Sequence, residues 1–336
     1  MAVTAPRRPA RPAATPAGGW IFARFLLRRL LLLAVTLAVA SVAVFGLIAV
    51  LPGSPAQVIL GTAATPASVR QLTAQLGLNQ PVWQQYLHWA GGLLSGRLGD
   101  SYISQQPVGP EIWQALTVTG PLVLLGLAVG LAVGLTLGVL AARHHRGLAG
   151  AAFSAASQLG IAVPSYVAGI LLLTIVTVKL HWLPDSAFNG WSAGAGPALE
   201  SLVLPCVALG LAEGAVVSRY VRSSVVEVLR SDYLRTARAK GLRPGQALVR
   251  HGLRNAAVPV VTVLGLEIAG LLVGAIIVEN VFTLPGLGTM LVQAIDNRDL
   301  ILVQDIVMLI VAAVLVVNLL VDVSYRLLDP RIALGS

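Results

Sequence analysis

The sequence predicts an all-α membrane protein in which six helices cross the bilayer. Of its 336 residues, 56% are hydrophobic and only 11% are charged, and the mean hydropathy is +0.82. A soluble domain is about 25% charged, so much of this surface must face lipid. The apolar residues gather in six runs, each near the roughly 20 residues that a helix needs to cross hydrocarbon. Because the runs are long and do not alternate with polar residues, helices are favoured over a β-barrel.

The runs also divide the chain into segments. Residues 1–19 are rich in Pro, Ala and Arg and are predicted to be a disordered tail. The first span is predicted over 20–51, and residues 52–111 form a helical segment outside the membrane. A core of five helices follows over 112–333. Its apolar runs cover 112–142, 147–178, 201–218, 255–278 and 300–325.

The basic residues predict the orientation. If the N-terminus is cytoplasmic, 19 of the 23 Lys and Arg residues fall in cytoplasmic segments. The positive-inside rule then places both termini in the cytoplasm of a multi-pass protein of the cell membrane. The net charge of +9 is thereby accounted for by topology, so lipid and not nucleic acid is the expected surrounding.

The segment between the first two spans carries helix signals. Thr65 precedes Pro66, which suits a cap followed by the first helical position, and Gly77 suits a helix end. Pro81 can open a second helix, in which Trp83 and Trp89 are expected to lie at the membrane interface. Two compatible interpretations follow: a small cap packed on the outer mouth, or a docking surface for an external partner.

The longest polar interlude of the C-terminal half is a loop predicted over 222–255, between the fourth and fifth spans. Asp232 can begin a helix after Ser231, Gly241 can end it, and Pro244 can begin another. Such a helix–Gly–helix arrangement between two spans is a rigid lever. The alternative is a basic loop that contacts anionic lipid headgroups.

This loop resembles the coupling loop of ATP-binding-cassette (ABC) importer permeases. That pattern is Glu-Ala-Ala, three residues and Gly, and here Arg235-Thr236-Ala237 precede Gly241. Arg in place of Glu is a departure that the dipeptide/oligopeptide/nickel permease branch shows. The resemblance implies that the ATPase-coupling residues are Tyr233, Arg235, Thr236, Ala237, Lys240, Gly241 and Pro259.

Other motifs are similar to the same branch over roughly residues 24–333. They are Leu76-Gly77-Leu78-Asn79-Gln80-Pro81, Val278-Glu279-Asn280-Val281-Phe282, Pro285-Gly286-Leu287-Gly288 and Asn318-Leu319-Leu320-Val321-Asp322. Ser54 and Arg97 stand where the branch usually has Asp, so any role of those carboxylates is absent here.

The resemblance implies the fold of a type I ABC importer permease that moves short peptides by alternating access. The implied partners are a second homologous permease, two cytoplasmic ATPase subunits that bind ATP and Mg, and an extracytoplasmic solute-binding protein. No cofactor is expected on this chain. The alternatives are a permease for nickel or another metal–ligand complex in the same family, an ion-coupled secondary carrier, and a membrane-anchored scaffold.

The chain is not expected to be an enzyme. A phosphate-binding P-loop needs Gly-Lys-Ser or Gly-Lys-Thr, but the two lysines, Lys179 and Lys240, follow Val178 and Ala239. Nucleotide hydrolysis must therefore occur on another chain. The histidines are scattered and show no spacing typical of metal ligands, so no metal site is expected.

Two glutamates fall within predicted spans, where a carboxylate is costly unless it faces protein or water. Glu267 is near the middle of the fifth run, and Glu213 is expected nearer the cytoplasmic face. They are candidates for a substrate pathway that meets a cationic group. The alternative is a protonated or Arg-paired carboxylate in helix packing.

Acidic residues also cluster near the predicted outer mouth. Glu279 and Asn280 are a possible outer gate. Asp296, Asp299 and Asp305 are expected to be solvated charges or docking charges.

Overall fold

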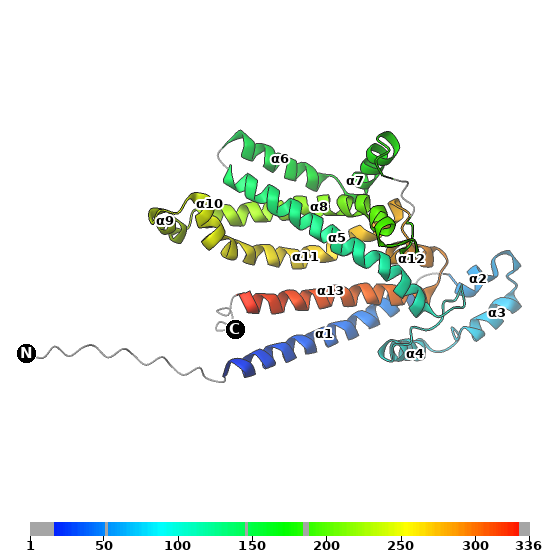
Figure 1. Ribbon diagram of the computed structural model, residues 1–336. Coiled ribbons are helices and arrows are strands. Elements are labelled where there is room, and N and C mark those ends of the chain that lie inside the picture. The colour runs from blue at the N-terminus through cyan, green and yellow to red at the C-terminus, as the bar shows by residue number, and fades with distance from the viewer. Residues whose placement is uncertain (1–16, 51–52, 145–146, 184–187, 329–336) are drawn as a thin grey trace, which may run out of the picture.

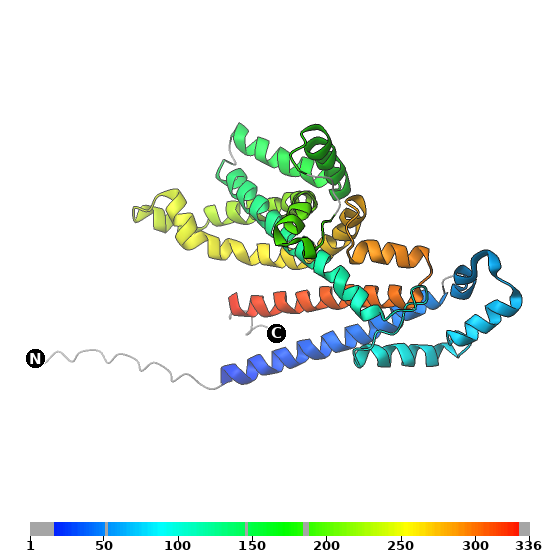
Figure 2. The ribbon, with the colours of Figure 1, turned by 45° about the vertical axis from the view of Figure 1, so that its right-hand side comes forward.

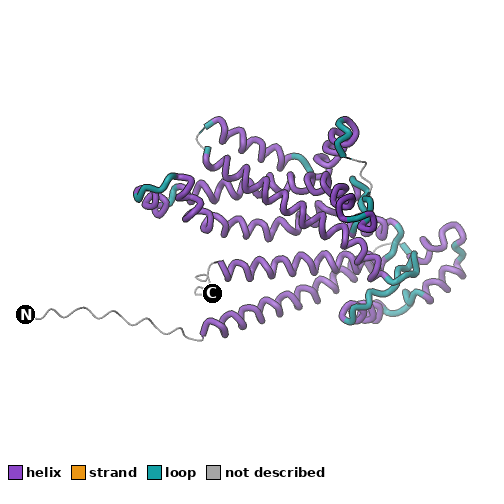
Figure 3. The backbone as a smooth tube through the Cα atoms, viewed as in Figure 1, coloured by secondary structure: helices purple, strands orange, loops and turns teal. Residues whose placement is uncertain are grey.

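The computed structural model describes residues 17–50, 53–144, 147–183 and 188–328; most of these residues are helical, and no strand is named among them (Figures 1 and 3). Five of the helices are long and apolar enough to cross a membrane. They are α1 (Ala17–Val50), α5 (Val108–Arg143), α8 (Ala195–Leu229), α11 (Leu253–Val281) and α13 (Leu300–Leu328). The all-helical prediction is therefore confirmed.

Short helices gather at the two ends of this bundle (Figures 1 and 2). One end carries α2 (Pro55–Leu60), η1 (Gly61–Ala63), α3 (Pro66–Gln75), α4 (Val82–Leu94), η3 (Trp191–Ala193) and α12 (Leu287–Asp296). The other end carries α9 (Asp232–Ala239), α10 (Pro244–Ala247) and the π-helical η4 (Leu248–Gly252). The start of α1 and the end of α13 lie at the α9 end.

The third predicted span is not one straight helix. It consists of α6 (Leu148–Ala162) and α7 (Ser165–Leu172), the latter continued by the π-helical η2 (Leu173–Lys179), with a bend of 98° between them. The bend arises at Pro164, which disfavours helical geometry in the residue before it. Val163 accordingly has φ −94° and ψ 113°. Counted as one broken span, this pair brings the total to six.

Three predicted boundaries need correction. Helix α1 begins at Ala17, so the last three residues assigned to the tail are helical, and residues 1–16 lie outside the described part. Helix α5 begins at Val108, four residues before the predicted run. The loop predicted over 222–255 shrinks to Arg230–Gly252. Helix α8 continues beyond its apolar run because Val225 and Val228 still pack in an apolar cluster.

Helix α8 is the centre of the bundle and packs against α5, α6, α7 and α11. In the most apolar stretch of α8, 72% of the residues are buried, compared with 28% in the corresponding stretches of α5 and α11. The closest packing is with α5, whose four glycines recur at every fourth residue and therefore lie on one face. These are Gly126, Gly130, Gly134 and Gly138, which face Leu209, Glu213, Val217 and Val221 of α8. Glycine lets two helix backbones approach closely in a membrane, where packing and not the hydrophobic effect joins helices.

Helix α1 lies beside α13 and completes the bundle (Figures 1 and 2). At the α9 end, the Arg29 guanidinium lies 2.8 Å from the Asp322 carboxylate. Toward the other end, the ring of Phe45 packs against Tyr86 and Trp89 of α4, with centroid distances of 5.5 and 5.8 Å. This contact fixes α4 against α1.

The helix signals before α5 are confirmed in the structure. The Thr65 hydroxyl accepts a hydrogen bond from the Ser68 amide, and the Ser68 hydroxyl accepts one from the Thr65 amide. Gly77 has φ +70°, which suits glycine, and Pro81 precedes the first residue of α4. The expected interfacial position of Trp89 is wrong, because this side chain is only 9% exposed.

The prediction that Asp299 and Asp305 are solvated or docking charges is also wrong, because each is only 2% exposed. The indole N–H of Trp89 donates to Asp305 at 2.8 Å. Asp299 accepts from the Ser101 hydroxyl and, at 3.2 Å, from the Tyr102 amide. The two carboxylates therefore fasten α4 and the loop before α5 to the start of α13. These hydrogen bonds offset part of the cost of burial, although Oδ2 of Asp305 accepts none within the described residues.

We expect Trp89→Phe to lower the stability of the purified protein, because Asp305 then keeps its burial but loses the indole donor. Leaving a buried acceptor without its partner costs about 1–3 kcal/mol. The midpoint of thermal unfolding measures this loss. Trp83→Phe is the matched control, since Trp83 lies on the same helix and is 61% exposed. Equal midpoints for both variants would contradict the assigned contact.

Candidate functional site

The loop between α8 and α11 forms a helical elbow, defined here as Arg230–Gly252. Helix α9 ends at Ala239, and Gly241 follows its C-cap residue Lys240 with φ +95°, so the predicted stop by Gly241 is confirmed. A Cβ atom at this position would meet nothing within 4 Å. Backbone conformation, and not space, therefore requires glycine here.

The elbow is anchored to both helices that flank it. Its buried side chains belong to one apolar cluster with α8 and α11, and this cluster includes Leu234, Ala247 and Leu248 of the elbow with Val225, Val228, Ala256 and Val260. A Cβ atom at Gly252 would lie 2.8 Å from Leu248 and 2.9 Å from Val228. This packing makes α9, the end of α8 and the start of α11 one mechanical unit.

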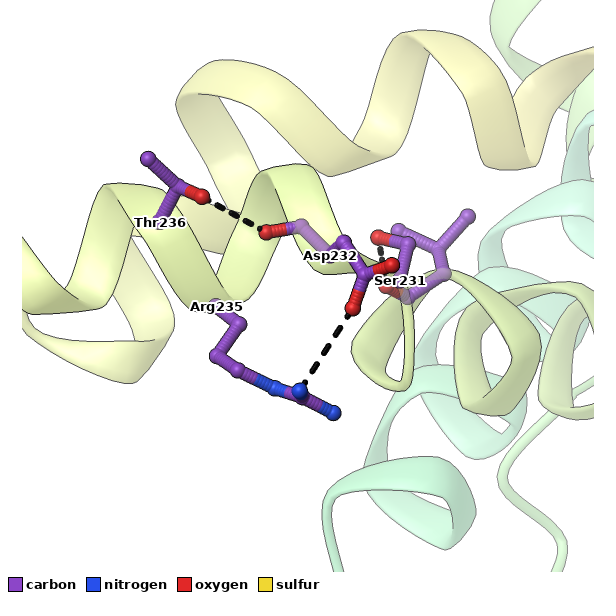
Figure 4. A network of polar contacts seen from close by, with 5 residues as sticks. Ser231, Asp232, Arg235 and Thr236 are labelled. Atoms are coloured by element: carbon purple, nitrogen blue, oxygen red, sulfur yellow. Dashed lines mark hydrogen bonds and ion pairs between the residues drawn. The ribbon is translucent and has the colours of Figure 1, made fainter.

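The outer surface of α9 carries most of the predicted coupling residues. Tyr233, Arg235, Thr236 and Lys240 are exposed, and Ala237 is half-buried. Figure 4 shows Arg235 reaching back to Asp232, at 3.5 Å, and the Thr236 hydroxyl donating to the carbonyl of Asp232 at 3.0 Å. The Tyr233 hydroxyl accepts from the amide of Asn255 at 3.1 Å. Pro259 lies inside α11, beyond the elbow.

The elbow surface is strongly basic. Its exposed cationic residues are Arg230, Arg235, Arg238, Lys240, Arg243 and Arg250. Asp232 is the only acidic residue in this sequence range, and its exposed ion pair with Arg235 neutralises little of the surface. The elbow is therefore suited to an acidic partner surface.

The structure brings Glu213 and Glu267 together, although the sequence suggested different depths. Glu213 of α8 is 8% exposed, and Glu267 of α11 is half-buried. A Cβ atom at Gly274 of α11 would lie 3.0 Å from Leu209 of α8, and this contact puts the two glutamates at nearly the same level of the bundle. Helices α8 and α11 run in opposite directions, so residues far apart in sequence meet at one level of the bundle.

Glu279 fastens α12 to the bundle. Its carboxylate accepts from the Thr119 hydroxyl and from the Gly288 amide, both at 2.6 Å. Thr119 in turn accepts from the Leu287 amide at 2.8 Å. Three elements thus meet at one buried carboxylate: α5, α11 and the start of α12. We call this contact the α12 anchor.

The proposed gate partner of Glu279 points elsewhere. Asn280 is exposed, and its side-chain amide donates to the Ile276 carbonyl of its own helix at 2.8 Å. The sequence patterns did not predict the α12 anchor. Gly286 and Gly288 could have indicated that another group packs closely against the start of α12. A Cβ atom at either position would overlap the Glu279 carboxylate.

A cavity of about 740 Å³ opens near the α12 anchor. It lies among the start of α5, the residues before α8, and the α11–α12 connection, and its polar and aromatic lining includes Glu111, Gln114, Phe188, Trp191 and Gln293. The Trp191 indole donates to the Thr117 carbonyl at 3.0 Å and holds this lining in place. The sequence did not indicate this cavity, because three separate segments form it.

The fold and these features define a class of protein. Residues 134–334 match the family described as binding-protein-dependent transport system inner membrane component, and residues 22–119 match its N-terminal part. The chain belongs to this family. It is a multi-pass membrane permease subunit of an ABC importer with the type I permease fold, so ATP is hydrolysed on separate subunits.

Particular relatives align along nearly their whole length. A protein named as a probable peptide ABC transporter permease of Sinorhizobium fredii is 38% identical over 308 residues, which is 92% of this chain and 98% of the relative. A glutathione transport system permease protein of Escherichia coli K12 is 36% identical over 308 residues, with the same coverage. Its counterpart in Salmonella typhimurium is 38% identical over 316 residues.

Proposed function

We propose that this chain is one of two homologous permease subunits in an inner-membrane importer of short peptides, with both termini in the cytoplasm. Two ATPase subunits bind ATP and Mg on the cytoplasmic side. A solute-binding protein delivers the peptide to the outer end, where α2, α3 and α4 are placed.

The observation that carries this proposal is the elbow. Its exposed basic surface on α9 is available to a partner, and its buried residue Leu234 packs with the ends of α8 and α11. Movement of an ATPase against α9 would tilt both helices together. Alternating access requires this kind of transmission between a nucleotide-driven subunit and the membrane core.

The charge distribution supports the orientation. Nine Lys and Arg residues lie between Arg219 and Arg254, around the elbow. The elbow is at the same end of the bundle as the start of α1 and the end of α13. The positive-inside rule places such an end in the cytoplasm.

The relatives support peptides as the substrate class. One is named for peptides and the others for glutathione, which is itself a tripeptide. The nickel alternative is not favoured by these names, and membership of the family argues against an ion-coupled carrier.

We expect the double variant Arg235→Glu, Lys240→Glu to abolish uptake, because it reverses two charges on the proposed coupling surface. The assay is ATP-dependent uptake of a labelled tripeptide by proteoliposomes that contain both permeases, the ATPases and the binding protein. Uptake should fall at least tenfold. The two permeases should still purify together, either with the two ATPases bound or without them. Arg70→Glu is the matched control, since Arg70 is exposed on α3 at the opposite end.

Two results would refute the proposal. The first is that the wild-type assembly accumulates no tripeptide in the presence of ATP. The second is that the elbow variant and the Arg70 control transport equally well.

A further inference from the structure

The apolar seam between α8 and α11 is interrupted at one level. On the outer side of that level, Leu209 and Leu271 belong to one apolar cluster. On the elbow side, Val217 and Leu264 belong to another. Between these clusters α8 carries Glu213, whose Cβ and Cγ face Gly130 of α5, and α11 carries Glu267. Each helix therefore has one carboxylate at a level where its neighbours in the two clusters are apolar.

Helix geometry places the two carboxylates at nearly the same height. A Cβ atom at Gly274 of α11 would lie 3.0 Å from Leu209 of α8, which aligns the two helices at these residues. With a rise of 1.5 Å per residue, Glu213 lies about 6 Å from Leu209 and Glu267 lies about 10 Å from Gly274, both toward the elbow. Their offset along the bundle is about 4 Å, and Glu267 is at the middle of the apolar stretch Asn255–Val281.

Within the described residues, nothing neutralises this pair. Oxygen Oε1 of Glu213 is buried and accepts no hydrogen bond there, and neither glutamate forms an ion pair with a described residue. Glycine opposite the site leaves room for the side chain: a Cβ atom at Gly130 would lie 3.0 Å from Cβ and Cγ of Glu213. Carboxylates in hydrocarbon are costly without a positive partner.

We propose that Glu213 and Glu267 together bind the primary ammonium group of a peptide during its passage through the membrane. This inference rests on the proposed function. An ammonium group has three N–H donors and no acceptor, so it can bond both carboxylates at once and balance their charge. A divalent metal ion is a poorer match, because Ca²⁺ and Mg²⁺ take about six or more oxygen ligands and the described residues contain no group of three His, Cys, Asp or Glu that suits a metal.

The test uses the assembled permease–ATPase complex in nanodiscs and two probes, labelled Ala-Ala-Ala and the same peptide acetylated at its N-terminus. Equilibrium binding without the binding protein isolates the membrane site from recognition outside it. We expect the free-amine peptide to bind at least tenfold more tightly than the acetylated peptide. The double variant Glu213→Gln, Glu267→Gln should bind both peptides equally, because the amide retains the shape of each side chain and removes the charge.

Glu200→Gln is the control, since Glu200 is an exposed carboxylate on the same helix α8; it should keep the wild-type preference. Each single Gln variant should lose part of the preference, and the two losses should not add if both groups contact one ammonium.

ATP-dependent uptake by the complete importer separates the two proposals. If the wild type transports tripeptide but the double Gln variant retains the full preference for the free amine, the ammonium site is refuted and the importer stands. An equal affinity of the wild type for both peptides also refutes the site and assigns the pair to proton binding or packing. If the wild type transports no peptide, the proposed function itself fails.

Discussion

Gly138→Ala is expected to destabilise the permease by about 1–3 kcal/mol or more, because one methyl group would force apart the two most closely packed helices. A Cβ atom there would lie 2.6 Å from Cβ of Val221 and 2.7 Å from the carbonyl oxygen of Ser218. The second contact is with backbone, so a change of side-chain rotamer cannot relieve it. Since α8 is the central helix, the displacement would extend to its other neighbours and to the elbow.

Another spanning helix supplies a control with the opposite expected sign. A Cβ atom at Gly46 of α1 would meet nothing within 4 Å. Alanine is favoured over glycine in a helix by about 0.5–1 kcal/mol, so Gly46→Ala should be neutral or stabilising. Unfolding midpoints of the purified variants and their recovery as monodisperse protein make the comparison. A Gly138 variant as stable as the Gly46 variant would contradict the close α5–α8 packing.

Glu279→Ala is expected to release α12 from the bundle. The change removes the acceptor of the Thr119 hydroxyl and the Gly288 amide, both of which remain buried. Each donor left without a partner costs about 1–3 kcal/mol, and the lost side chain leaves a cavity as well. Lower thermal stability and faster proteolysis near α12 should therefore appear together.

Asn280→Ala is the control, because it changes the residue next to Glu279 in the same motif, Val278–Phe282, without removing the anchor. The Asn280 side chain is exposed and bonds only its own helix in the contacts described, so its loss should change stability by less than about 0.5 kcal/mol. The α12 anchor is wrong if the protease cleaves Asn280→Ala near α12 as fast as Glu279→Ala, or if it cleaves neither variant faster than the wild type. Uptake by the two variants in the reconstituted importer then tests the outer-gate prediction directly.

Local patterns predicted local structure well. The capping residues Thr65 and Pro66, the glycine that follows α9 (Gly241), and the apolar runs all act through interactions within a few residues of themselves. The failures also had local causes: Pro164 broke a run that composition alone made continuous. Helix ends were predicted too short where one buried face, as at Val225 and Val228, extended a helix beyond its apolar run.

Partners distant in sequence were not predictable from a single chain. Asp299 and Asp305 looked like surface charges because their partners, Ser101 and Trp89, lie about two hundred residues away. The contact of Glu279 with Thr119 was not predicted because it spans 160 residues. The periodic glycines of α5 were visible, but only the facing residues of α8 showed what they accommodate.

The sequence by itself determined that this protein is helical, crosses a membrane, and carries a basic elbow of the kind that ABC importer permeases share. These properties depend on composition and on neighbours along the chain. Tertiary structure alone decided that Glu213 and Glu267 lie at one level of the bundle and that Glu279 holds α12, because antiparallel helices bring together groups that no local pattern relates. The cost of a carboxylate in hydrocarbon then makes the position of each partner decisive.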